Sequence, residues 1–151
     1  MNTTVLSRHV SSQTSIGAVE GFFDAFRRRS VDDMMGYCNP KGFVQILALG
    51  REGEGEIQTA GRKLWGNMIV AFPDLSNSVD FIFSDLDGHV CAEVAISGTQ
   101  SKDFDGIKNQ GRCYGIPHAF IFEVGEDGRI QRISDYWDNA TLYKQLGRKE
   151  L

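Results

Sequence analysis

The chain has 151 residues, a length typical of one domain that buries a core of its own. Hydrophobic residues make up 41% and charged residues 24%, and the net charge is -4, as expected of a soluble globular protein. The mildly acidic balance argues against nucleic-acid binding, which needs a basic surface. The longest apolar run, residues 68–72, is far shorter than the ~20 residues that span a bilayer, so we expect no membrane partner.

Cysteine use and the N-terminal residues indicate where the protein works. Cys38, Cys91 and Cys113 are odd in number and widely spaced, which is typical of free, mostly buried thiols in a reducing compartment. Residues 1–13 are polar and lack the apolar segment of a secretory signal, so we expect a flexible N-terminal arm. The sequence thus predicts a cytoplasmic protein with a single domain over residues 14–151.

Helical patterns dominate the first half of the chain. An amphipathic helix is predicted over residues 14–29, because apolar residues recur there at helical spacing: Ile16, Val19, Phe22, Phe23 and Phe26. A short helix over residues 31–37 begins behind a capping pair formed by Ser30 and Asp33. A third helix is expected over residues 56–71, after a Gly- and Glu-rich loop.

Strand patterns fill most of the remaining chain. One strand is predicted between the second and third helices, over residues 42–49. Four more follow the third helix, over residues 79–83, 90–97, 113–124 and 130–137, and a closing helix or tail occupies residues 141–147. An Asp-Gly turn at residues 127–128 joins the last two strands into a hairpin. Helices followed by consecutive antiparallel strands are the order of an α+β domain.

Several common catalytic motifs are missing from the sequence. It has no phosphate-binding GxxxxGK[ST] loop, no complete dinucleotide-binding fingerprint and no GxSxG elbow. The three histidines are scattered and form no HExxH motif, so we expect no metal site.

The last hairpin carries the remaining chemistry. Because strand residues two apart share a face, each strand presents one titratable group among apolar ones: His118 with Phe120 and Phe122, and Asp135 with Ile133 and Trp137. If both faces lie on one side of the sheet, His118 and Asp135 come within reach of each other. A buried Asp gains a raised pKa, which suits a general acid or base near neutral pH. The alternative is a structural Asp135 paired with a neighbour, and His118 as an ordinary core residue. Asp138 points to the opposite face and suits a strand-end or helix-capping group.

An ordered series of short segments completes the pattern. The sequence reads AFPDL at residues 71–75, SGTQ at 97–100, FDGI at 104–107, QGR at 110–112, DGRI at 127–130, DYWD at 135–138 and QLG at 145–147. Over about residues 14–147 this series resembles the SnoaL-like polyketide cyclases of the nuclear transport factor 2-like superfamily. The chain departs from that family's pattern at Phe23, at Phe120 and in the KNQG segment at residues 108–111.

The resemblance implies a cone-shaped α+β fold, in which a curved antiparallel sheet wraps around N-terminal helices and encloses a pocket. It also implies a homodimer or homotetramer packed through the sheet, and no cofactor or metal. By position, Asp135 matches the family's acid/base residue for intramolecular aldol ring closure, and His118 would orient it or polarise a carbonyl. The expected pocket residues are Phe22, Phe23, Phe26, Trp65, Phe120 and Trp137.

Three functions therefore compete. The leading hypothesis is a cofactor-free acid/base enzyme that cyclises a small apolar carbonyl substrate. The second keeps the pocket but assigns an isomerase, dehydratase or epoxide hydrolase reaction. The third is a non-catalytic domain that binds a small ligand, since fold alone does not determine function.

Overall fold

A computed structural model describes residues 10–149. Two helices come first, two strands precede the third helix, four strands follow it, and a short helix lies at the C-terminal end. The elements are α1 (Ser12–Arg27), α2 (Val31–Gly36), β1 (Cys38–Ile46), β2 (Glu54–Glu56), α3 (Arg62–Ala71), β3 (Ser76–Ser84), β4 (His89–Thr99), β5 (Cys113–Val124), β6 (Ile130–Trp137) and α4 (Asn139–Leu146). The predicted α+β class is confirmed.

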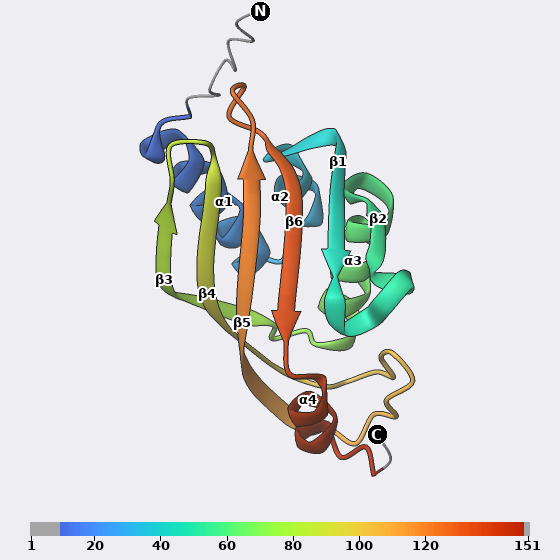
Figure 1. The fold of residues 1–151 in the computed structure, drawn as a ribbon. Helices are drawn as coiled ribbons and strands as arrows, with labels where there is room; N and C mark the ends of the chain where they lie inside the picture. The colour runs from blue at the N-terminus through green and yellow to red at the C-terminus, as the bar shows by residue number, and fades with distance from the viewer. Residues whose placement is uncertain (1–9, 150–151) are drawn as a thin grey trace, which may run out of the picture.

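The strands form one six-stranded sheet in the order β2-β1-β6-β5-β4-β3. Helices α1, α2 and α3 lie behind one face of this sheet, and α4 lies beside the start of β5 and the end of β6 (Figure 1). All strand pairs are antiparallel except β1 and β6, which run parallel. Parallel neighbours need a long connection, and α3 with β3, β4 and β5 supplies it here. The sheet is therefore mixed, whereas the sequence indicated an antiparallel one.

The first helix begins two residues before its predicted start. Ser11 caps it by accepting a hydrogen bond from the Thr14 backbone N–H over 3.1 Å. The buried Val10 donates its backbone N–H to the Leu86 carbonyl over 3.0 Å. Residues 10–13 therefore belong to the folded domain and not to an arm, while residues 1–9 of the predicted arm lie outside the described residues.

Other boundaries differ by a few residues. Strand β1 begins at Cys38, four residues before its predicted start, and a π-helical turn over Ile57–Gly61 precedes α3. Strands β5 and β6 have their predicted bounds. The predicted closing helix is α4, and Asp138 caps it by accepting from the Ala140 and Thr141 backbone N–H groups, as its position in the sequence indicated.

Aromatic side chains fill the space between the helices and the sheet. Phe22 meets Trp65 edge-on, with ring centroids 5.2 Å apart, and Phe23 meets Phe120 in the same way at 5.0 Å. The ring centroid of Phe122 lies 5.7 Å from that of Phe22 and 5.6 Å from that of Phe23. All five side chains are at most 1% exposed. Edge-to-face packing of this kind stabilises a core beyond simple burial, so these rings form a tightly interlocked centre.

The three cysteines form no disulfide, as predicted. Burial raises the pKa of Cys38 to about 12, so this thiol stays protonated and behaves as a core residue. Cys113 is exposed and Cys91 is half-buried, so the expectation of mostly buried thiols is wrong. Both lie on the face of the sheet that the helices leave uncovered, where alternate strand residues point away from the core.

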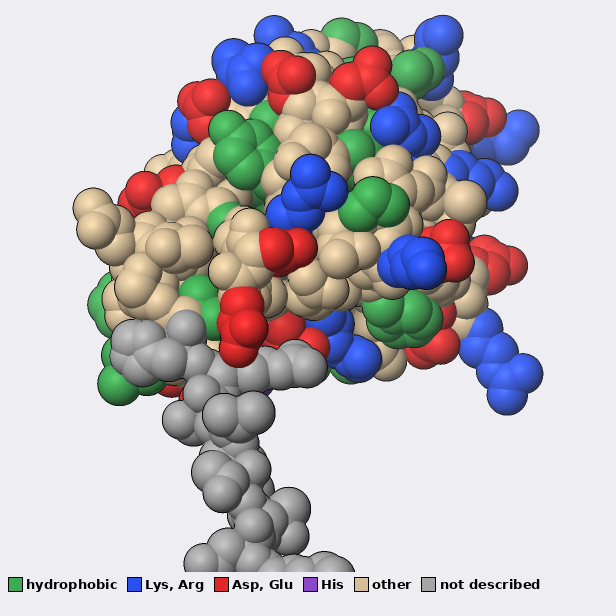
Figure 2. Space-filling model, turned by 90° about the horizontal axis from the view of Figure 1, so that it is seen from above, with side chains coloured by type: hydrophobic (Ala, Val, Ile, Leu, Met, Phe, Trp, Pro, Cys, Tyr) green, Lys and Arg blue, Asp and Glu red, His purple; other side chains and the backbone are tan. Residues whose placement is uncertain are grey.

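The surface mixes charges of both signs. Figure 2 shows Lys and Arg side chains interspersed with Asp and Glu at one end of the molecule, with separate hydrophobic groups between them. Such mixing keeps the local electrostatic field weak. Among residues 10–149, no helix is long and apolar enough to cross a membrane.

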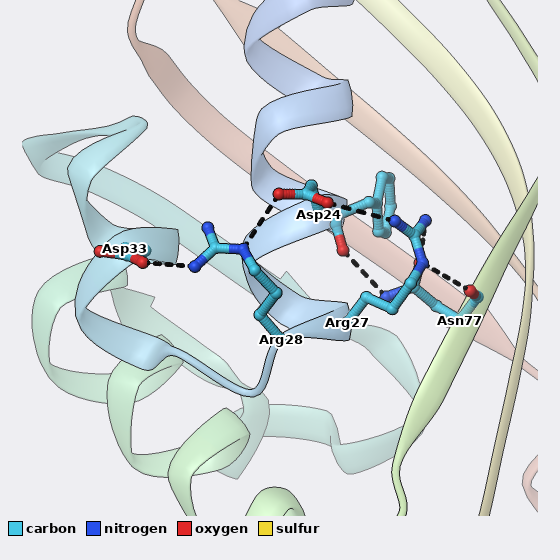
Figure 3. Close-up of polar contacts among 6 residues, drawn as sticks. Asp24, Arg27, Arg28, Asp33 and Asn77 are labelled. Carbon is cyan, nitrogen blue, oxygen red and sulfur yellow. Dashed lines mark hydrogen bonds and ion pairs between the residues drawn. The ribbon is translucent and has the colours of Figure 1, made fainter.

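A polar contact ties α1 to the edge strand β3. Asn77, which is 6% exposed, donates its side-chain N–H to the Phe23 carbonyl over 3.1 Å (Figure 3). Arg27 donates both to the Asn77 side-chain oxygen, over 3.1 Å, and to its backbone carbonyl, over 3.2 Å. Asp24 makes ion pairs with Arg27 and Arg28 on the exposed side of α1. The Asn77 amide is thus satisfied on both sides, as a buried polar group requires.

We expect Asn77→Ala to lower the free energy of unfolding by about 1–3 kcal/mol, because it leaves buried groups unpaired. Urea denaturation measures this. Asp24→Ala is the matched control: it removes ion pairs of a carboxylate whose side chain is 58% exposed, so its effect should stay below ~1 kcal/mol. Equal losses in the two variants would contradict a structural role for the Asn77 contact.

Candidate active site

The hairpin of β5 and β6 brings the two predicted titratable residues together. Phe120 lies opposite Asp135 and His118 lies opposite Trp137, so the two chosen strand faces are on the same side of the sheet. His118 Nδ1 lies 2.9 Å from Asp135 Oδ1. The two residues are only 4% and 3% exposed, respectively. A buried His–Asp pair on the inner face of the sheet is therefore the centre of the candidate site.

Burial determines the electrostatics of this pair. It raises the pKa of Asp135, and the charge and hydrogen bond of His118, together with the Tyr136 backbone N–H, offset part of that rise. The contact with His118 therefore offsets part of the cost of burying the Asp135 carboxylate.

The same burial predicts a pH-dependent stability. A carboxyl whose pKa is raised in the folded state adds most to the free energy of unfolding below its unfolded pKa, about 3.9. This contribution is lost as the pH rises through the folded pKa. Asp135→Asn removes the titration. The unfolding free energy of the wild type minus that of the variant should therefore fall as the pH rises from about 4. Urea denaturation over a pH series measures it, and a difference independent of pH contradicts the raised pKa.

His118 also lines a small internal cavity. Eight residues line it: Met68, Phe72, Phe104, Tyr114, Ile116, His118, Trp137 and Leu142. Its volume is about 10 Å³, room for about one water molecule. His118 Nε2 is buried and has no hydrogen-bond partner among residues 10–149. Asp135 does not line this cavity, so the pair presents its imidazole and not its carboxylate to the space.

The predicted pocket residues divide into two groups. Trp137 lines the cavity, and its ring centroid lies 5.0 Å from that of His118. The other five residues do not line it: Phe22, Phe23, Phe26, Trp65 and Phe120. In the structure these five side chains pack into the hydrophobic core, and their role as pocket walls stays a prediction. Phe120 still contacts the site, since its ring stacks on that of His118 at 5.7 Å.

Six of the eight residues that line the cavity are not among the site residues that the sequence predicted. Tyr114 and Ile116 precede His118 on β5 by four and two residues, and all three are buried on one face. Extending the period-two pattern of the hairpin toward its start would have found them. The other four come from α3, the segment after it, the 101–112 segment and α4, and the sequence carries no local signal that brings them to one place.

A larger cleft lies outside the cavity. It has a volume of about 970 Å³, and Phe104 lines both the cleft and the cavity. The cleft carries charges of both signs, among them Lys63, Lys102 and Asp103. Phe104 packs edge-on against Phe72 with ring centroids 5.5 Å apart. The Phe104 ring therefore forms part of the wall between the cleft and the His118 side of the molecule.

No group of three or more His, Cys, Asp or Glu side chains within the described part of the chain could hold a metal ion.

A sheet covered by helices on one face, with a buried His–Asp pair beside an internal cavity, defines a small α+β domain of the nuclear transport factor 2-like fold. The chain matches the SnoaL-like polyketide cyclase family over residues 18–146, and it belongs to that family. No curated protein sequence gives a match to the chain.

Solved structures share this fold at low sequence identity. AclR from Streptomyces galilaeus, a proposed hydroxylase, is 18% identical with a TM-score of 0.79, and the match covers 93% of this chain and 100% of AclR. A proposed SnoaL-like polyketide cyclase from Jannaschia sp. CCS1 is 15% identical with a TM-score of 0.79, covering 93% and 95%. IdmH from Streptomyces antibioticus, a proposed polyketide cyclase, is 23% identical with a TM-score of 0.74, covering 88% and 98%. These likenesses support the fold.

Proposed function

We propose that this protein is a cofactor-independent acid/base enzyme that closes a ring in a small, largely apolar carbonyl substrate by an intramolecular aldol-type reaction. The observation that carries the proposal is the buried contact of 2.9 Å between His118 Nδ1 and Asp135 Oδ1. His118 also lines the cavity, and its Nε2 has no hydrogen-bond partner within residues 10–149. Family membership supports the reaction class. His118 is the proton-transfer group in this proposal. Asp135 is a positioning residue that orients the imidazole and stabilises its positive charge.

The proposed reaction needs one proton acceptor that later returns the proton. His118 Nε2 takes a proton from the carbon next to a carbonyl, and an enolate forms. The enolate carbon attacks a second carbonyl carbon of the same molecule, which forms a carbon–carbon bond and leaves an alkoxide. His118 returns its proton to the alkoxide oxygen, so the product is an isomer of the substrate. Asp135 stabilises the imidazolium between the two steps.

The surroundings of the site suit this chemistry. The cavity lining is mostly apolar, and exclusion of water strengthens the electrostatic interactions inside it. A volume of about 10 Å³ cannot hold an organic substrate, so the walls must separate when a substrate binds. Phe104 is the residue through which we expect access, because it borders the large outer cleft as well.

Hydrogen–deuterium exchange tests the proposal without knowledge of the natural substrate. The protein is incubated in D₂O with small apolar 1,3-diketones and β-keto esters, and NMR follows exchange at the acidic carbon. A linear 1,5-diketone reports ring closure in the same experiment. We expect exchange above the buffer rate and a cyclic product. Exchange without a cyclic product would indicate isomerase or dehydratase chemistry, and no exchange with any probe would overturn the acid/base assignment.

A non-catalytic ligand-binding domain is the second candidate function. The small cavity volume favours it, because side chains occupy most of the interior. The cavity beside the buried His–Asp pair favours the enzyme, because His118 lines that cavity and its Nε2 has no hydrogen-bond partner within residues 10–149. Binding of the diketone probes without any exchange is the result expected of this second candidate.

We also propose that two copies of the chain associate through the open face of the sheet. Five apolar side chains on that face are 37–61% exposed: Phe43, Phe81, Phe83, Ile121 and Tyr136. Exposed apolar patches often mark protein–protein interfaces.

The free cysteines suit a protein that works in a reducing compartment such as the cytoplasm.

Sedimentation velocity tests the association. We expect the wild type to sediment as a dimer at micromolar concentration and Ile121→Lys to shift it toward the monomer, because the new charge would be buried in the interface. Val70→Lys is the matched control, since Val70 is 55% exposed on α3, away from this face. A monomeric wild type, or equal effects of the two variants, would contradict the interface.

A further inference from the structure

Tyr114 contributes a second polar group to the inner cavity. Its side chain is 5% exposed, and its ring packs edge-on against Phe72 with ring centroids 5.0 Å apart. Its hydroxyl is buried and has no hydrogen-bond partner in the described part of the protein. Burial raises the pKa of Tyr114, and the negative charges of Asp135 and Asp74 add to the rise. The hydroxyl therefore keeps its proton and can only be a neutral donor or acceptor.

Tyr114 and His118 reach the cavity from the same strand. They lie four residues apart on the inner face of β5, which places their Cα atoms about 13 Å apart at the usual rise of a strand. Both side chains line the cavity, and both carry a polar atom without a partner within residues 10–149. Buried polar atoms are almost always paired, so two unpaired atoms on side chains that line one cavity indicate that a molecule in the cavity, a water or a bound ligand, supplies their partner.

The chemistry of the two atoms indicates what that ligand is. A phenol O–H donates to an oxygen, while an imidazole nitrogen held by a carboxylate at Nδ1 accepts a proton at Nε2. A carbonyl compound with an acidic C–H next to the carbonyl carries both required partners. The rest of the lining is apolar, which matches hydrocarbon substituents.

We propose that Tyr114 donates a hydrogen bond to the carbonyl oxygen of the bound substrate while His118 Nε2 removes the proton from the neighbouring carbon. This inference rests on the proposed acid/base function and names the group that stabilises its enolate. As the proton moves to His118 Nε2, the electron pair of the C–H bond moves into the carbonyl and charge develops on the oxygen that Tyr114 holds. A donor aimed at developing charge lowers the barrier of that step.

Tyr114→Phe tests this assignment, because it removes only the hydroxyl. We expect the rate constant for deuterium exchange to fall about 10²- to 10³-fold, the range for loss of one such donor, while KM changes little. Tyr143→Phe, which removes a hydroxyl from α4 outside the cavity lining, is the matched control and should exchange at the wild-type rate. An unchanged rate in Tyr114→Phe would overturn the role of Tyr114 and leave the proposed function intact.

Two further measurements keep the inference testable if no probe exchanges. Binding of p-nitrophenolate, an oxyanion that resembles an enolate, is followed by its absorbance; we expect Tyr114→Phe to bind it at least tenfold more weakly than the wild type does. Equal binding overturns the inference. Urea denaturation separates function from structure: since the hydroxyl lacks a partner, its removal should leave the midpoint unchanged or raise it. A lower midpoint would show a structural role instead.

Discussion

His118→Gln is expected to lower the rate constant for deuterium exchange by about 10²- to 10⁴-fold, the usual contribution of a positioned general base. Glutamine keeps the approximate size and polarity of the side chain but cannot take up a proton at the cavity. Asp135→Asn should lower the rate within the same range, because an amide favours the tautomer with the proton on Nδ1 less than a carboxylate does and cannot balance the positive charge of the imidazolium. NMR of the exchanging carbon measures both variants.

The double variant distinguishes a working pair from two separate groups. Since Asp135 acts through His118, we expect His118→Gln with Asp135→Asn to be no slower than His118→Gln alone. His89→Gln is the matched control: His89 lies on the exposed side of β4, where its ring nitrogen is 2.7 Å from Asp85 Oδ2. A His118→Gln variant with more than half the wild-type rate would remove His118 from the mechanism.

Phe22→Ala is expected to lower the free energy of unfolding by about 3–5 kcal/mol. Phe22 is 0% exposed and contacts three other aromatic rings, those of Phe23, Trp65 and Phe122, so its truncation leaves a cavity at the centre of the core. Domains of this size are stable by roughly 5–15 kcal/mol, and the variant would therefore be close to unfolding at moderate temperature. Urea denaturation followed by tryptophan fluorescence measures the loss.

Two matched variants show whether lost packing is the cause. Phe22→Leu should recover part of the stability, because leucine refills much of the volume. Leu86→Ala should change the unfolding free energy by less than about 0.5 kcal/mol, since Leu86 is 60% exposed in the turn between β3 and β4. A loss below 1 kcal/mol in Phe22→Ala would contradict a tightly packed aromatic centre.

Aromatic residues that fill the packed core and aromatic residues that line a cavity look alike in the sequence. Helical spacing correctly indicated that Phe22, Phe23 and Phe26 face the interior, but a helix face can point into a packed core or into a cavity. The outcome depends on how α1 lies against the sheet and on which rings from β5 meet it. Residues far apart in the chain set that arrangement, and local periodicity contains no information about it.

The roles within the His–Asp pair show the same division. The pattern of the hairpin placed His118 and Asp135 on inner strand faces, and Asp135 was expected to be the group that meets the substrate. In the structure the Asp135 carboxylate contacts His118 Nδ1, and His118 lines the cavity while Asp135 does not. Side-chain rotation within the packed sheet decides which group meets the cavity, and sequence spacing does not specify that rotation.

The sequence by itself determined the α+β class, the bounds of β5 and β6, the cap at Asp138 and the residues of the buried pair. Those features depend on local periodicity and on hydrogen bonds between near neighbours, which spacing encodes directly. Only the tertiary structure decided the parallel contact of β1 with β6, the closed aromatic core and the cavity that joins Tyr114 to His118. These features arise where segments distant in sequence pack together, and the volume that their side chains leave unfilled depends on all of them at once.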